Sequence, residues 1–131
     1  MSRFLTAVES VLEADAVRLE TDFRALPGWC SLKAFGLLVM LENDFGAPVT
    51  IDRLRELKTV GDLELEALAQ LAAKTFGVAR SAFDPRLGYG ETAEWDSVNH
   101  LRLVMAAEKL LGVTYPIETV PALRHLADFL R

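Results

Sequence analysis

The chain has 131 residues, of which 51% are apolar and 25% are charged, and its net charge at pH 7 is −5. This acidic balance, without a basic stripe and interleaved aromatic residues, argues against nucleic acid as a partner. No unbroken apolar run is longer than that of residues 37–41, which is far too short to span a membrane. A single cysteine, Cys30, excludes an internal disulfide and a cysteine-based zinc site.

The first residues predict where the protein is located. Apolar residues at helical spacing predict a helix over residues 3–13, and this segment carries Glu9 and Glu13. A secretory signal would not carry acidic residues there. We therefore expect a soluble, cytoplasmic protein, and we expect it to be a monomer.

In the first half, the longest helical pattern follows a polar loop over residues 14–28. The hydroxyl of Ser31 is placed to cap this helix, and Gly46 ends it. Its apolar positions, together with Glu42, follow a period near 3.6: Leu32, Phe35, Leu38, Val39, Glu42 and Phe45. Residues 52–57 predict short helical turns.

A central helix is expected to begin after Thr59, which can cap it. From Leu63 to Phe76 there is no proline, glycine or serine, and strong helix formers dominate. Its apolar residues fall on two nearly opposite sides. One side carries Val60, Leu63 and Ala67, and the other carries Leu65, Leu68, Ala72 and Phe76. We expect this helix to close two cores.

The second half repeats the plan of the first. A long loop over residues 77–94 has Phe83, Pro85, Leu87 and Tyr89 as its expected anchors. Ser97 is placed to cap the next helix, which Gly112 ends. The apolar positions of this helix are Val98, Leu101, Val104, Met105, Leu110 and Leu111. Pro121 is expected to open a short turn before a final helix containing Leu123, Leu126, Phe129 and Leu130.

The two halves are copies related by a shift of 66 positions without a gap. Residues 28–32 and 94–98 both place a tryptophan two residues before a serine that precedes an apolar helix. The same shift superposes six further pairs: Leu37 and Leu103, Glu42 and Glu108, Gly46 and Gly112, Ile51 and Ile117, Leu57 and Leu123, and Asp62 and Asp128. Such a repeat predicts two small all-α units, residues 1–63 and 64–131.

The sequence gives little support for catalysis or for a metal site. His100 follows Ser97 by three residues, but no acidic residue is evident to orient it as a base. Cys30 at a helix start could be a reactive thiol, although a partly buried structural cysteine explains it as well. There is no phosphate-binding glycine loop, metal-ligand cluster or calcium-loop pattern. We therefore expect a protein that is not an enzyme.

Residues 26–35 and 94–101 resemble the modification site of acyl and peptidyl carrier proteins, in which Asp-Ser-Leu opens the second of four helices. The resemblance covers nearly the whole chain as two consecutive carrier units. It includes residues 42–46 and 59–63 in the first copy, and Glu108, residues 111–113 and residues 126–130 in the second. The family's aspartate is present in the second copy as Asp96, before Ser97, whereas Cys30 stands in its place before Ser31 in the first copy. Val98 replaces the family's leucine after Ser97.

This resemblance implies two four-helix carrier bundles joined through a shared or continuous central helix. It implies that Ser97 and Ser31 bind 4′-phosphopantetheine covalently, added by a phosphopantetheinyl transferase. Acyl-loading and acyl-processing enzymes would then act on thioesters held by the arms in a fatty-acid, polyketide or related pathway. The alternative is an unmodified helical adaptor derived from carrier units.

Overall fold

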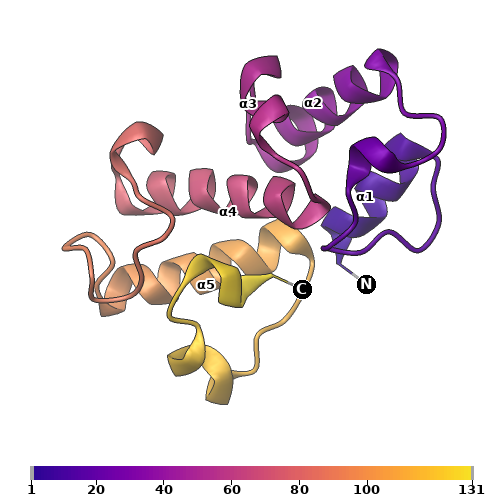
Figure 1. The fold of residues 1–131 in the computed structure, drawn as a ribbon. Coiled ribbons are helices and arrows are strands. Elements are labelled where there is room, and N and C mark those ends of the chain that lie inside the picture. Colours follow the sequence, from indigo (N-terminus) through magenta and orange to yellow (C-terminus); the bar gives the residue numbers. More distant parts are fainter. Residues whose placement is uncertain (1, 131) are drawn as a thin grey trace. The chain divides into compact units, whose positions relative to one another are not determined.

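A computed structural model describes residues 2–130 and shows a mostly helical chain (Figure 1). The described residues form no strand beyond one isolated bridge between Asp22 and Thr59. The all-α prediction is therefore confirmed. The helices are α1 (Arg3–Leu12), α2 (Ser31–Phe45), α3 (Ile51–Glu56), α4 (Val60–Phe76) and α5 (Ser97–Leu111). Short 3-10 helices are η1 (Phe23–Ala25), η2 (Arg80–Ala82), η3 (Ile117–Ala122) and η4 (Leu126–Phe129).

The chain divides into two compact units, unit 1 (Met1–Ala67) and unit 2 (Leu68–Arg131). The sequence predicts this division between residues 63 and 64, whereas the compact units meet after Ala67, inside α4. None of the described helices is both long enough and apolar enough to cross a membrane.

The core of unit 1 is built on the packing of α1 against α2. The rings of Phe4 and Phe45 lie 5.0 Å apart between their centroids and join the two helices. The other buried residues of these helices are Val8, Leu12, Ala34, Leu37, Met40 and Leu41. Phe23 from η1 is also fully buried, and its side chain anchors the polar loop that follows α1.

The central helix is one unbroken element, α4, as predicted. Thr59 begins it with a reciprocal cap: its hydroxyl accepts the Asp62 amide at 3.1 Å, and the Asp62 carboxylate accepts the Thr59 amide at 3.0 Å. The two predicted stripes are buried apart from Leu65, which is half-buried. The residues of α4 up to Ala67 belong to unit 1, and those from Leu68 onward belong to unit 2.

The core of unit 2 gathers around Trp95, which is fully buried. Its ring lies 5.5 Å from that of Phe76 in α4 and 6.4 Å from that of Phe129 in η4, measured between centroids. Tyr115 adds a hydrogen bond from its hydroxyl to the Phe129 carbonyl oxygen at 2.5 Å. The buried apolar residues of α5 are Leu103, Val104, Ala107 and Leu111.

The 66-residue repeat is visible in the elements themselves. Helices α2 and α5 each have 15 residues and end at Gly46 and Gly112, which adopt φ of 60° and 65°. These left-handed conformations favour glycine, which explains the residue type at both ends. Helix α3 and the 3-10 helix η3 begin at corresponding positions. The Asp62 cap recurs as Asp128, which accepts the amide of His125 at 3.0 Å.

The structure differs from the sequence prediction in parts of unit 2. Leu87, expected as a loop anchor, is exposed, whereas Phe83 is buried as expected. Pro121 lies inside η3 rather than opening a turn. The final helix is only the four-residue 3-10 helix η4, because the Leu123 pattern that precedes it falls at the end of η3.

Candidate functional site

The two serines of the repeat occupy the same structural position. Ser31 is the first residue of α2 and Ser97 is the first residue of α5. Both side chains belong to exposed residues. Each hydroxyl therefore lies at the N-terminus of a four-turn helix, where the first backbone amides have no partner within the helix.

The prediction that the serines cap these helices is wrong. The N-cap residues are Cys30 and Asp96, one position earlier. The Asp96 carboxylate accepts the Asn99 amide at 2.8 Å, whereas the Cys30 side chain makes no capping hydrogen bond. Both helices therefore start one residue earlier than a serine cap requires, with a side-chain cap at α5 and none at α2.

Exchanging the cap residues should change stability in opposite directions. Asp96→Ala is expected to lower the free energy of unfolding by about 1 kcal/mol, and Cys30→Asp is expected to raise it by a similar amount. Ser97→Ala should change it by less than about 0.5 kcal/mol, because its hydroxyl is not the cap. Urea unfolding of the three variants checks these values. A loss with Ser97→Ala as large as that with Asp96→Ala would contradict the assignment of the cap.

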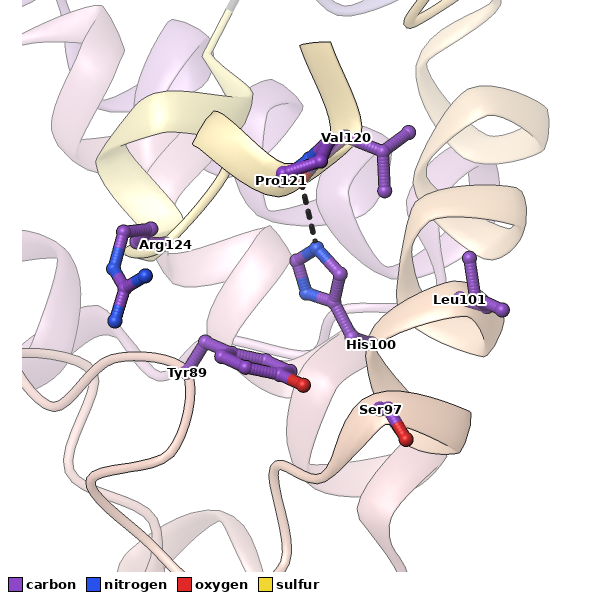
Figure 2. A pocket seen from close by; sticks show the side chains of 7 residues that line it. All are labelled: Tyr89, Ser97, His100, Leu101, Val120, Pro121 and Arg124. Atoms are coloured by element: carbon purple, nitrogen blue, oxygen red, sulfur yellow. Dashed lines mark hydrogen bonds between the residues drawn. The ribbon is translucent and has the colours of Figure 1, made fainter. Parts of the chain in front are cut away.

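His100 lies beside Ser97 but is held by other groups. Its Nδ1 accepts a hydrogen bond from the Trp95 indole Nε1 at 3.0 Å, which places the ring proton on Nε2. That Nε2 donates to the carbonyl oxygen of Val120 at 2.9 Å (Figure 2). Both ring nitrogens are therefore engaged, and the residue is 7% exposed. This geometry suits a core histidine that joins α5 to η3, not a base for Ser97.

A pocket of about 320 Å³ opens next to Ser97. Figure 2 shows its lining, which comes from the start of α5, the loop before it and η3. The lining residues are Tyr89, Ser97, His100, Leu101, Val120, Pro121 and Arg124. Ser97 and His100 are candidate functional residues in the sequence, whereas no motif contains Arg124. Only the 66-residue shift, which pairs Arg124 with another basic residue, Lys58, marks this position.

An exposed apolar stripe follows each serine, where the sequence places apolar positions of an amphipathic helix. On α2 it consists of Leu32, Phe35 and Val39, which are between 38% and 77% exposed. On α5 it consists of Val98, Leu101 and Met105, which are between 56% and 68% exposed. The spacing i, i+3, i+7 puts each set on one helix face. Both helices therefore carry apolar residues on two faces, one buried and one open.

Comparisons with known proteins found nothing similar. No protein-family model, no curated protein and no solved structure matches this chain. Within residues 2–130, no group of three or more histidine, cysteine, aspartate or glutamate side chains is arranged to hold a metal ion.

Proposed function

We propose that the protein is a tandem carrier that holds acyl groups as thioesters on 4′-phosphopantetheine arms attached to Ser97 and Ser31. Each unit is a small four-helix carrier bundle, and the two share α4. The protein supplies no catalysis of its own. A phosphopantetheinyl transferase adds the arms, and acyl-loading and acyl-processing enzymes use them. We further propose that the protein is a monomer and is located in the cytoplasm.

One observation carries this proposal: an exposed serine opens a 15-residue helix beside an exposed apolar stripe, and the whole arrangement occurs twice at the same spacing. A serine at one helix start is common and needs no function. Repetition of the stripe is harder to explain by folding, because exposed leucine, phenylalanine and methionine side chains do not stabilise the core. A surface that contacts other proteins explains both features together.

The position of each hydroxyl suits the group that the proposal attaches to it. A phosphodiester on the first residue of α2 or α5 would lie close to backbone amides that have no partner within the helix. The positive end of the helix dipole favours the same negative charge. A carrier serine needs no activating base in its own chain, because the transferase provides one. This agrees with the engagement of both His100 nitrogens by Trp95 and Val120.

The exposed stripes support contact with partner enzymes at the point of attachment. Leu32 and Val98 directly follow the two serines, so an enzyme that reaches the hydroxyl or the arm must approach these side chains. Ile51 in α3 and Ile117 in η3 are exposed as well and are related by the same shift. The matching surfaces predict that both units bind the same enzymes through apolar contacts.

The residue before each serine should control how fast the arm is added. The carboxylate of Asp96 provides a negative charge and hard oxygen ligands beside Ser97 for the metal-bound coenzyme, and Cys30 provides neither beside Ser31. We expect Ser31 to be modified more slowly than Ser97, and Cys30→Asp to accelerate Ser31 alone. Peptide-level mass spectrometry over a time course with coenzyme A and a transferase measures both sites.

Two controls accompany this time course. Ser97→Ala should remove one arm and leave the rate at Ser31 unchanged. Equal modification rates at the two serines in the chain without substitutions would show that the missing carboxylate does not limit the reaction. The same conclusion would follow if Cys30→Asp did not increase the rate at Ser31. An unmodified adaptor, which the exposed stripes would also suit, predicts no arm at either serine.

A further inference from the structure

One backbone carbonyl group, at equivalent positions of the repeat, accepts its hydrogen bond from a different side chain in each unit. In unit 1, the Arg24 guanidinium donates to the carbonyl oxygens of Leu54 and, at 2.5 Å, Leu57. It also lies over the ring of Phe23, 4.7 Å from the centroid. In unit 2 the carbonyl that corresponds to Leu54 is that of Val120, and His100 donates to it instead. The guanidinium has no counterpart there.

Glycine stands in unit 2 where unit 1 has the arginine. Gly90 corresponds to Arg24 under the 66-residue shift, and nothing lies within 4 Å of the place its Cβ would take. The pocket beside Ser97 opens in this part of unit 2, next to the Val120 carbonyl. The cavities described in unit 1 lie on the other side of the corresponding helix, between α1 and α2. One of them reaches Cys30 and Leu32 beside Ser31, but it is also lined by Glu13, and the ammonium of its Lys33 donates to the Leu12 carbonyl oxygen.

The lining of the unit 2 pocket combines apolar walls with a single cationic side chain. Leu101, Val120 and Pro121 provide apolar walls. Tyr89 packs edge-on against the His100 ring, with 4.9 Å between the centroids. The one lining residue with a formal charge at pH 7 is Arg124, and no acidic side chain lines the pocket.

The Arg124 guanidinium is available to a ligand. In the described part of the chain it makes no ion pair or side-chain hydrogen bond; its backbone amide donates to Asp128. Figure 2 shows Arg124 and Ser97 on opposite sides of the pocket, with Tyr89 and His100 between them. Ser97 and the cation therefore mark two ends of the pocket.

We propose that this pocket is a subsite, specific to unit 2, for a short acyl group that ends in a carboxylate. The apolar walls take the carbon chain, and Arg124 binds the carboxylate. The proposal rests on the proposed function, because the arm on Ser97 brings the acyl group to the pocket. The phosphate of the arm is a less suitable partner for Arg124, since it is bonded to the Ser97 oxygen on the other side.

The test compares succinyl and butyryl groups, which have the same four-carbon length and differ in the terminal carboxylate. The modified protein is loaded with each, and the NMR signals of the Arg124 Nε–H group and the Tyr89 ring are recorded. We expect both signals to shift with succinyl and not with butyryl or with the bare arm. Arg124→Gln should abolish the response of Tyr89, and the matched unit 1 variant Lys58→Gln should leave it unchanged.

Two results would overturn the proposal. An equal response to butyryl would mean that the pocket binds an alkyl chain without recognising a terminal carboxylate. A full response to the bare arm would assign Arg124 to the phosphate.

A second experiment keeps this inference separate from the proposed function. Chain without an arm is titrated with free succinyl-pantetheine and butyryl-pantetheine, and the same signals are followed. We expect the succinyl compound to bind more tightly, and Arg124→Gln to weaken it by about threefold to fivefold, as for an exposed ion pair. If Ser97 never accepts an arm, the proposed function fails while this titration still decides the pocket. No preference for succinyl would overturn the subsite.

Discussion

Glu64→Gln is expected to stabilise the protein by about 3 kcal/mol at pH 8 and to have little effect at pH 5. Glu64 in α4 is fully buried, and neither carboxylate oxygen has a hydrogen-bond partner in the described structure. Burial raises the pKa of Glu64 from 4.5 to about 7. The folded state therefore holds this proton more tightly than the unfolded state, and its stability falls as pH rises from about 4.5 to about 7.

Urea unfolding at pH 5 and pH 8 measures this effect, with the variant compared to the original chain at each pH. Glu66→Gln is the matched control, because Glu66 is also buried in α4 but pairs with Arg53 at 2.9 Å. It should bring no gain at pH 8. A stability difference between Glu64→Gln and the original chain that is the same at both pH values would show that Glu64 is not an unpaired buried acid.

Glu66→Pro is expected to cost about 3 kcal/mol or more, because proline inside α4 removes a backbone hydrogen bond and clashes with the preceding turn. Residues on both sides of this position belong to buried cores, Leu63 in unit 1 and Leu68 in unit 2. We therefore expect both units to lose stability. The indole NMR signals of Trp29 and Trp95 report on unit 1 and unit 2 separately during urea unfolding.

The control for the proline variant is again Glu66→Gln, which removes the charge that Arg53 pairs with but keeps the helix. Only the proline should shift the unfolding of both tryptophan signals. If Trp95 unfolds at the same urea concentration with and without the proline, α4 does not couple the stability of the two units.

Much of the fold follows from local signals in the sequence. The helix at α4 was predictable because strong helix formers run without interruption and Thr59 caps them. The ends of α2 and α5 were predictable because Gly46 and Gly112 supply the left-handed conformation that ends a helix. The repeat then transfers each observation from one half to the other. Short-range chemistry determines these features, so one sequence is enough to find them.

The exposed stripes could not be predicted, because periodicity does not say which apolar face of a helix is buried. Leu32 and Leu101 fit the helical period as well as Leu37 and Leu103 do, yet the first two are exposed and the last two are fully buried. Tertiary contacts make that choice. The pocket beside Ser97 was hidden for the same reason, since Arg124 follows Ser97 by 27 positions and reaches the pocket only through the path of η3.

The central claim is that the chain carries phosphopantetheine arms, and an intact mass measurement tests it most directly. The unmodified protein is incubated to completion with coenzyme A and a broad-specificity phosphopantetheinyl transferase. We expect the mass to rise by two arms, the first on Ser97 and the second on Ser31. A mass that does not change, in folded protein and alongside a carrier protein that the same transferase modifies, would contradict the account.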